Sequence, residues 1–226
     1  MNDHTPLNQG SVFMEGEGNA WFARNIETIA KKTDYNELDA VKRTLSPFSH
    51  NINDILEIGC SSGDKLAHLC LHFDAKGKGV DPSATAVEHG NRLYAGKIRP
   101  SLALQVATAS DLPFPDESFD LVYFGFCLYL VDRKDLFKAI AEADRVLKLG
   151  GYLAILDFDP SCRNKRPYAH KPGVYSYKTS YADFFTSGGH YYLVSKDSMS
   201  HGTPHFTPDS DERVSLSVLF KELDPY

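Results

Sequence analysis

The sequence has little cysteine and no cysteine pair at the spacing of a metal or redox motif. Its four cysteines are scattered over 226 residues as Cys60, Cys70, Cys127 and Cys162. Zinc sites and disulfide frameworks depend on closely spaced cysteines, so we expect neither. His68 and His72 are four residues apart, but no third ligand lies near them in the sequence, and we expect no metal. Scattered, reduced thiols fit a cytoplasmic protein.

Long apolar runs and an excess of positive charge are also missing. No segment approaches the roughly 20 apolar residues of a membrane-spanning helix. The first residues lack the basic and then apolar order of a secretory signal. The formal net charge of -6 argues against general nucleic-acid binding. We therefore expect no membrane and no nucleic-acid partner, and the sequence leaves the oligomeric state open.

The stretch from Ile55 to Leu66 is the most informative part of the sequence. It reads Ile-Leu-Glu-Ile-Gly-Cys-Ser-Ser-Gly-Asp-Lys-Leu: an apolar strand that breaks at Gly59, followed by a helical pattern from Gly63. A glycine-bearing turn between a strand and a helix exposes backbone amides to a ligand at the helix N-terminus. Such turns are typical of sites for nucleotides and nucleotide-like cofactors.

Strands and helices alternate around this turn. Continuous apolar strands with intervening helices predict a parallel sheet covered on both faces. No internal repeat and no second domain is visible, and 226 residues suffice for one large core. We predict an α/β fold with a doubly wound, mostly parallel seven-stranded sheet in a single domain. The expected strands are residues 54–58, 78–80, 102–107, 119–124, 152–158, 190–195 and 213–221.

The glycine spacing helps to choose the ligand. A dinucleotide site needs G-x-G-x-x-G, but Ser61 and Asp64 stand where the second and third glycines belong. No Gly-Lys-Ser/Thr follows, so a P-loop is excluded. The missing glycines therefore disfavour a nicotinamide-dependent oxidoreductase.

Four segments together resemble class I S-adenosylmethionine-dependent methyltransferases. They are the turn Ile55–Gly63, Gly79–Ser83 at the end of the second strand, Asp111–Val122 before the fourth, and Val146–Leu153 before the fifth. The resemblance covers roughly residues 50–160 in the right order. It implies a Rossmann-like fold, S-adenosylmethionine as the cofactor, and methyl transfer to a small molecule.

The resemblance also assigns cofactor contacts. Asp81 would accept the ribose hydroxyls, and Glu57 would orient the ammonium group of the methionine moiety. Ser61 replaces the family's middle glycine, and Thr108 stands where many members carry an aspartate for adenine. The predicted cofactor-binding residues of the core are Glu57, Gly59, Cys60, Ser61, Gly63, Asp64, Lys65, Asp81, Pro82, Thr108, Ala109, Ser110, Phe124, Gly125 and Phe126.

The N-terminal part carries a second cluster. Trp21, Arg24 and Asn25 lie on a predicted amphipathic helix. Since the family often closes such a helix over the cofactor, Arg24 would reach the methionine carboxylate and Trp21 would line the acceptor pocket. We expect a flexible lead-in over residues 1–18 and a methyltransferase domain over residues 19–226. This domain divides into a helical cap (19–46), a cofactor-binding core (50–160), and an acceptor loop with the last strands (161–226).

Residues 161–178 are basic and aromatic, and they contain no acidic residue. In open α/β sheets ligands bind outside the carboxyl ends of the strands, so the segment after the fifth strand is well placed to hold the acceptor. Its charge predicts a small anionic acceptor, such as a phosphorylated or nucleotide-linked sugar. The alternative is a non-catalytic cofactor-binding or partner-binding member of the same fold. The candidate substrate-binding residues are Arg163, Lys165, Arg166, Tyr168 and Tyr175; the candidate bases are His170, Asp157 and Tyr129.

Overall fold

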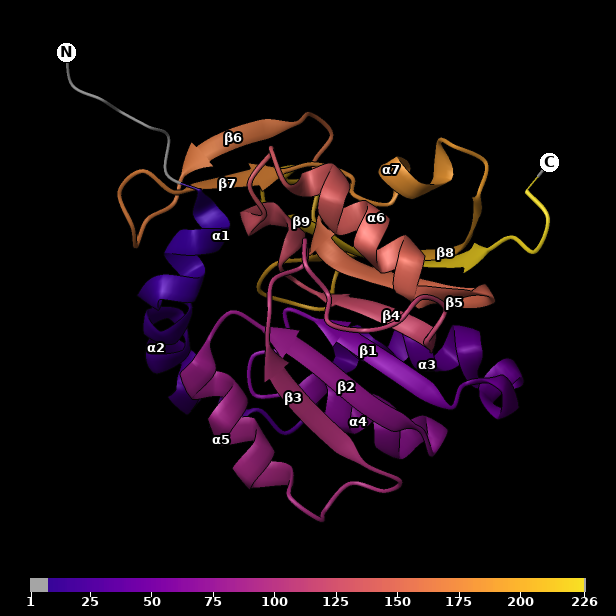
Figure 1. The fold of residues 1–226 in the computed structure, drawn as a ribbon. Coiled ribbons are helices and arrows are strands. Elements are labelled where there is room, and N and C mark those ends of the chain that lie inside the picture. Colours follow the sequence, from indigo (N-terminus) through magenta and orange to yellow (C-terminus); the bar gives the residue numbers. More distant parts are fainter. Residues whose placement is uncertain (1–7, 226) are drawn as a thin grey trace.

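The computed structural model describes residues 8–225 and is built around one seven-stranded sheet (Figure 1). The strand order is β3-β2-β1-β4-β5-β9-β8. Neighbouring strands from β3 to β5 pair in parallel, whereas β9 pairs antiparallel with both β5 and β8. The predicted seven-stranded, mostly parallel sheet is therefore confirmed. Its strands are β1 (Asp54–Ile58), β2 (Lys76–Asp81), β3 (Leu102–Val106), β4 (Phe119–Gly125), β5 (Leu147–Phe158), β8 (Tyr191–Ser200) and β9 (Arg213–Lys221).

Helices cover both faces of the sheet. The longer connections between parallel strands are helical, as the parallel order requires. Shorter 3-10 turns span Asn36–Leu38, Ser46–Asn51 and Leu128–Leu130. The α-helices are α1 (Gln9–Val12), α2 (Gly18–Lys31), α3 (Asp39–Leu45), α4 (Asp64–Phe73), α5 (Ala84–Tyr94), α6 (Leu136–Val146) and α7 (Asp183–Thr186).

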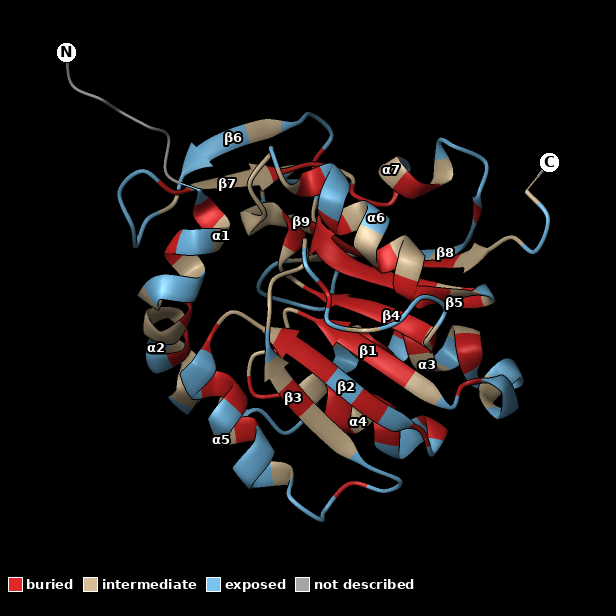
Figure 2. Ribbon diagram, viewed as in Figure 1, coloured by how far each residue is buried: buried red, intermediate tan, exposed pale blue. Residues whose placement is uncertain are grey.

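The apolar strand residues alternate between two cores. Ile55 and Tyr123 pack with α3 and α4 on one face, whereas Leu56 and Phe124 pack with α6 and α7 on the other. This follows from the two-residue period of a strand, which sends successive side chains to opposite faces. Figure 2 shows the resulting band of buried residues through the middle of the sheet. Both faces of the sheet are therefore covered by packed side chains, and we expect a ligand to bind at the ends of the strands.

The N-terminal segment differs from the expected lead-in. Residues 1–7 lie outside the described residues, but from Gln9 the chain is helical: α1 leads through a π-helical turn, Phe13–Glu17, into α2. Gln9 is 2% exposed. Its amide donates to the carbonyls of Leu130 (2.9 Å) and Tyr175 (3.1 Å) and accepts from the Tyr175 N–H (2.8 Å). These long-range hydrogen bonds order a segment whose sequence alone has little helix signal.

Residues 159–189 are more regular than their sequence suggests. They contain a two-stranded hairpin, β6 (Asn164–Pro167) with β7 (Tyr175–Lys178), and the short helix α7. Figure 1 shows this hairpin beside α1, at the end of the N-terminal helices away from α5. Among residues 8–225, no helix has the length and apolar character to cross a membrane.

We predict that Gln9 holds α1 over the sheet. Replacing it in Gln9→Ala removes three hydrogen bonds at a buried position, which should cost about 1–3 kcal/mol in the free energy of unfolding. Amide hydrogen exchange should accelerate over residues 9–17 more than elsewhere. Gln105→Ala is the matched control, since Gln105 makes no side-chain hydrogen bond within the described chain. Unchanged exchange in the Gln9 variant would mean that α1 is held by other contacts.

Candidate functional site

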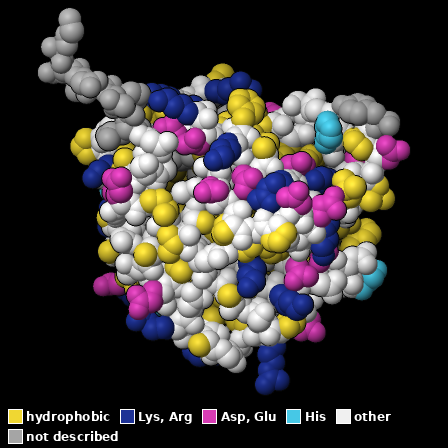
Figure 3. Space-filling view, viewed as in Figure 1, with side chains coloured by type: hydrophobic (Ala, Val, Ile, Leu, Met, Phe, Trp, Pro, Cys, Tyr) yellow, Lys and Arg dark blue, Asp and Glu magenta, His cyan; other side chains and the backbone are white. Residues whose placement is uncertain are grey.

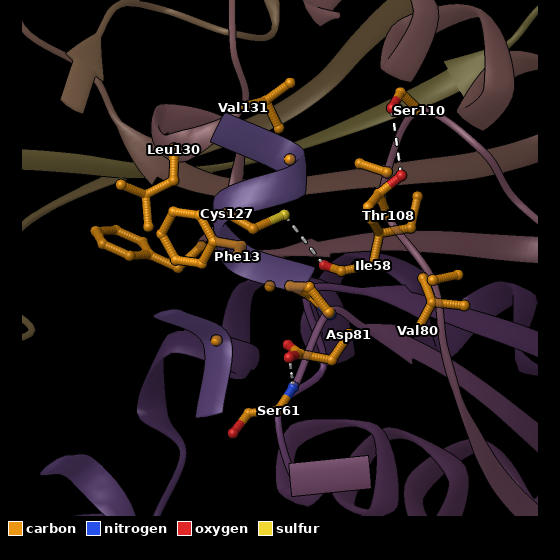
Figure 4. A pocket seen from close by; sticks show the side chains of 18 of the residues that line it. Phe13, Ile58, Ser61, Val80, Asp81, Thr108, Ser110, Cys127, Leu130 and Val131 are labelled. Atoms are coloured by element: carbon orange, nitrogen blue, oxygen red, sulfur yellow. Dashed lines mark hydrogen bonds between the residues drawn. The ribbon is translucent and has the colours of Figure 1, made fainter. Parts of the chain in front are cut away.

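A cleft of about 300 Å³ lies where the carboxyl ends of β1, β2, β3 and β4 meet (Figure 4). The segment from α1 to α2 lines it from the opposite side, as the N-terminal helices run along this edge of the sheet in Figure 1. We call it the cofactor cleft. Its lining residues are Gly10, Phe13, Gly18, Trp21, Ile58, Gly59, Ser61, Lys65, Val80, Asp81, Pro82, Ala107, Thr108, Ala109, Ser110, Gly125, Phe126, Cys127, Tyr129, Leu130, Val131, Asp132 and Asp135.

The turn after β1 has the backbone shape that the glycine pattern predicts. Gly59 and Gly63 have φ values of 76° and 79°, in the left-handed region. A Cβ on Gly59 would approach the Cβ of Cys127 at 2.6 Å, so a side chain there is excluded on two grounds. Ser61 is also left-handed, with φ at 49°. The serine therefore keeps the backbone conformation that a glycine would adopt, and it bears the associated strain.

Asp81 ends β2 and anchors this turn. Its Oδ2 accepts from the Ser61 N–H at 2.8 Å, and its Oδ1 accepts from the Ser83 N–H at 2.8 Å (Figure 4 shows the first bond). Burial raises the pKa of this carboxyl, and the two backbone hydrogen bonds oppose the shift. Each oxygen can accept one more hydrogen bond beside the cleft. This suits the paired hydroxyl groups of a ribose.

Glu57 lies fully buried behind the cleft. Its Oε2 accepts from the Leu66 N–H at 3.0 Å, whereas Oε1 has no hydrogen-bond partner among the described residues. A Cβ on Gly125 would meet Oε1 at 2.5 Å, so that glycine lets the carboxyl approach the end of β4. The Lys65 ammonium is 3.8 Å from Oε1. Burial raises the pKa of Glu57 to about 8. An orphaned buried oxygen beside the cleft fits a cationic group such as an ammonium.

Aromatic and hydroxyl side chains complete the cleft. The Thr108 and Ser110 hydroxyls lie 3.3 Å apart after β3. Phe126, directly after β4, packs against Tyr129 with ring centroids 5.2 Å apart. Trp21 from α2 also lines the cleft. Burial raises the pKa of Tyr129 above its ordinary range. The electron-rich faces of such rings attract a sulfonium cation.

Several predicted cofactor residues do not line the cleft. The Arg24 guanidinium pairs with Glu17 at 2.5 Å and donates to the Tyr168 hydroxyl at 3.3 Å. The Asn25 amide donates to the Trp21 carbonyl. Cys60, Gly63, Asp64 and Phe124 stand behind the lining and support it; the Phe124 side chain, for example, is fully buried in the α6–α7 core.

The predicted acceptor residues lie on and around the hairpin. The Arg163 guanidinium is 5.7 Å from the Phe184 ring, and the Lys165 ammonium is 3.7 Å from the Tyr175 ring. Arg166 forms an ion pair with Asp211 at 2.5 Å. None of these residues lines the cofactor cleft.

The three candidate bases lie in different places. His170 follows Tyr168 in the hairpin turn, with ring centroids 5.2 Å apart. Asp157 is 2% exposed, and its carboxylate accepts from the N–H groups of Tyr129 and Phe158. Burial raises its pKa to about 7. Only Tyr129 lines the cleft.

The sequence argument missed part of the lining. Gly10 and Phe13 lie in the segment that we expected to be a lead-in, and Leu130, Asp132 and Asp135 follow the fourth strand. For Gly10 and Phe13, the only local signal was an aromatic residue among glycines. Leu130, Asp132 and Asp135 accept the hydrogen bonds from Asn8 and Gln9 that hold α1 in place. Within residues 8–225 no cluster of metal ligands is present.

The sequence matches a family described as "Methyltransferase domain" over residues 56–155. The 2-phytyl-1,4-naphtoquinone methyltransferase of Nostoc punctiforme is 31% identical over 173 residues, which cover 73% of this chain and 70% of that protein. The 27-O-demethylrifamycin SV methyltransferase of Amycolatopsis mediterranei is 34% identical over 105 residues, covering 46% of this chain. The matched part spans only 38% of that relative's length.

Solved structures share the fold at lower identity. The 1,6-didemethyltoxoflavin-N1-methyltransferase of Burkholderia thailandensis, solved with 1,6-didemethyltoxoflavin and S-adenosylhomocysteine, has a TM-score of 0.70 and 13% identity. The match covers 94% of this chain and 88% of that one. A methyltransferase structure from Methanosarcina mazei has a TM-score of 0.60 and 20% identity, covering 77% of this chain and 94% of that one.

Asp81 should dominate cofactor affinity. In Asp81→Ala, the loss of charge-assisted hydrogen bonds should weaken binding of S-adenosylhomocysteine by about 1–3 kcal/mol in calorimetry. Asp111→Ala is the control, because Asp111 is exposed and follows β3 without lining the cleft. Equal affinity of a folded Asp81 variant and the wild type would remove Asp81 from the site.

Glu57 should make stability fall as pH rises. Its pKa is about 8 in the folded protein against an ordinary 4.5, so between these values only the folded state holds the proton. The stabilisation is complete below pH 4.5 and is lost as pH rises through about 8. Glu57→Gln should therefore be more stable than the wild type at pH 8, on the order of 1–3 kcal/mol in urea unfolding, and gain less at pH 5. The control is Glu88→Gln, at an exposed ion pair with Arg92. Parallel pH profiles of wild type and Glu57→Gln would contradict the prediction.

Proposed function

The chain belongs to the class I S-adenosylmethionine-dependent methyltransferases, and we propose that it methylates a small anionic metabolite, such as a phosphorylated or nucleotide-linked sugar. The observation that carries the cofactor half of this proposal is the cleft itself. It combines the Asp81 carboxylate, the left-handed turn of Gly59 and Ser61, and the unpartnered Glu57 oxygen behind it. A ribose, a methionine backbone and an ammonium group find complementary groups there.

S-adenosylmethionine supplies a methyl group bound to a sulfonium, which any well-aligned nucleophile can accept. The chain's own task is to hold the partners and exclude water. In our proposal Asp81, Ser61 and the N–H groups of the first turn hold the cofactor, and Thr108 and Ser110 border its adenine. The helices α1 and α2 cover the cleft, so that Trp21 and Phe13 keep solvent out.

Two cations on the hairpin support an anionic acceptor. Arg163 and Lys165 face aromatic rings and have no ion-pair partner within residues 8–225. Lys and Arg side chains gather on this part of the surface in Figure 3, where Figure 1 places β6. In a chain of net charge -6, a local excess of cations attracts anions selectively. Arg166 contributes less to this field, because Asp211 neutralises it.

In our proposal Tyr129 positions the acceptor, because it lines the cleft and its raised pKa keeps the phenol protonated as a hydrogen-bond donor. Removal of a proton from the acceptor is assigned to His170. His170 lies in the hairpin turn beside Tyr168. Asp157 is buried outside the lining and accepts a hydrogen bond from the Tyr129 backbone N–H at 3.3 Å, so it positions Tyr129.

The names of the relatives do not decide the acceptor. They act, by name, on a naphthoquinone and on a rifamycin precursor, and the second match covers less than half of either chain. The argument for an anionic acceptor therefore rests on residues of this chain. A partner-binding member without turnover is the remaining alternative, and a turnover assay decides between them.

The test is methyl transfer from tritium-labelled S-adenosylmethionine to a panel of nucleotide-linked and phosphorylated sugars, with quinones as the competing class. We expect label in at least one sugar. Label in quinones alone would overturn the acceptor class. Tight cofactor binding without transfer to either class would favour the non-catalytic alternative.

Neutralising the hairpin cations should raise the KM for the labelled sugar. The double variant Arg163→Gln, Lys165→Gln should raise it about tenfold, as expected for loss of charge-assisted contacts, and leave the affinity for S-adenosylhomocysteine unchanged. Arg166→Gln is the matched control and should change the KM less, because Arg166 is already paired. Equal KM values in the wild type, the double variant and Arg166→Gln would show that the hairpin is a solvated basic surface with no role in acceptor binding.

A further inference from the structure

A second cleft, of about 400 Å³, adjoins the cofactor cleft. Segments distant in the sequence form it: residues 32–37 after α2, the first turn of α4, residues 199–204 at the end of β8 and in the following loop, and single residues of the sheet, Phe126, Leu156 and Val214. Lys65 and Phe126 line both clefts. The two clefts therefore share two residues of their walls. We call this space the second cleft.

Phe126 belongs to the wall that the two clefts share. Its φ of 70° lies in the left-handed region, where a bulky side chain is uncommon and strained. The surrounding rings hold it there: His201 stacks on Phe126 with centroids 5.5 Å apart and planes 25° apart, and Phe158 packs at 5.0 Å. Strain that is maintained by packing next to a ligand site is typical of functional positions.

The second cleft combines an apolar wall with hydrogen-bonding groups. Phe126 and Met199 supply apolar surface, whereas Asn36 and His201 supply polar atoms. Its charged residues are two cations, Lys32 and Lys65, and two anions, Asp34 and Glu37, of which Lys32 and Glu37 form an ion pair at 2.6 Å.

A sugar ring has matching chemistry, with a face of C–H groups and a rim of hydroxyls. A quinone ring offers two carbonyl acceptors and no donor, so it would match fewer polar groups of the lining than a ring of hydroxyls does. The mixed lining therefore favours a polyhydroxylated ring over a quinone.

We propose that the second cleft binds the sugar ring of the methyl acceptor against the stacked rings of Phe126 and His201. The assignment rests on the proposed function, and it deepens it by giving the acceptor a site of its own. Direct adjacency to the cofactor cleft is what transfer requires, because reacting atoms must come within contact distance. His201 acts here as a positioning residue.

Met199 offers a readout that does not depend on turnover. The chain has three methionines, Met1, Met14 and Met199. Met199 lines the second cleft, and Met14 is 42% exposed in the π-helical turn and lines neither cleft. Protein labelled with 13C at the methionine methyls, and saturated with S-adenosylhomocysteine, is titrated with UDP-glucose, dTDP-glucose or GDP-mannose. Signals are assigned with Met199→Leu and Met14→Leu.

We expect a nucleotide-linked sugar to shift the Met199 methyl resonance and leave that of Met14 in place. A sugar that is methylated but leaves Met199 unshifted would overturn the second cleft alone. If none of the three sugars binds or is methylated, the sugar class is wrong in both proposals. Failure of S-adenosylhomocysteine to bind would overturn the proposed function itself.

Two histidines of the same loop give a matched pair of variants. His201→Ala should raise the Kd of the bound sugar about tenfold, through loss of a stacked, hydrogen-bonding ring, and leave the Kd of S-adenosylhomocysteine within about twofold. His205 is exposed on the same loop and does not line the second cleft, so His205→Ala should change neither constant. Equal sugar affinity in the two variants would contradict the proposal.

Discussion

The carboxylate of Asp81 connects the segments on which the rest of the site depends. One oxygen accepts from the Ser61 N–H in the turn after β1, and the other accepts from the Ser83 N–H at the start of α5. The Ser83 hydroxyl in turn donates to Asn19 of α2 at 2.9 Å. A single buried acid thus links the glycine turn, the next helix and the covering N-terminal helix. Any ligand that binds Asp81 is surrounded by backbone that Asp81 itself positions.

Several unfavourable features of the chain lie around the same edge. Ser61 and Phe126 are two of the four described non-glycine residues with left-handed backbone, and the fully buried Glu57 has one oxygen without a hydrogen-bond partner among the described residues. Each costs stability that the seven-stranded core must offset. Elsewhere the sheet follows ordinary rules of apolar alternation and pairing. Strained backbone and unsatisfied polar groups beside one cleft are typical of a ligand site. Residues placed there to bind a ligand are not placed to give the protein its highest stability.

The sequence could predict the sheet and the cofactor half of the site because both depend on local patterns. Continuous apolar strands ending in Gly59 and Asp81 set the parallel order and the ligand edge, and both features are visible within a few residues. The N-terminal helix was not predictable in the same way. Its order depends on Gln9 reaching Leu130 and Tyr175, more than 120 residues away. Glycines at positions 10, 16 and 18 hide that helix from propensity arguments, and two of them, Gly10 and Gly18, line the cleft.

Most of the residues that we propose for the acceptor lie outside the matched family region. That match spans residues 56–155, whereas the hairpin cations and the loop bearing His201 follow it, and α1 and α2 precede it. Relatives that share the cofactor half are therefore free to differ in what they methylate. The same division explains why Arg163 and Lys165 were recognisable as cationic from sequence but their contacts with particular aromatic rings were not. Charge is a property of composition, whereas the stacking of His201 on Phe126 depends on β8 and β9 bringing residue 201 back to the end of β4. In our proposal, acceptor specificity is thus a property of tertiary contacts between segments that have no common local pattern.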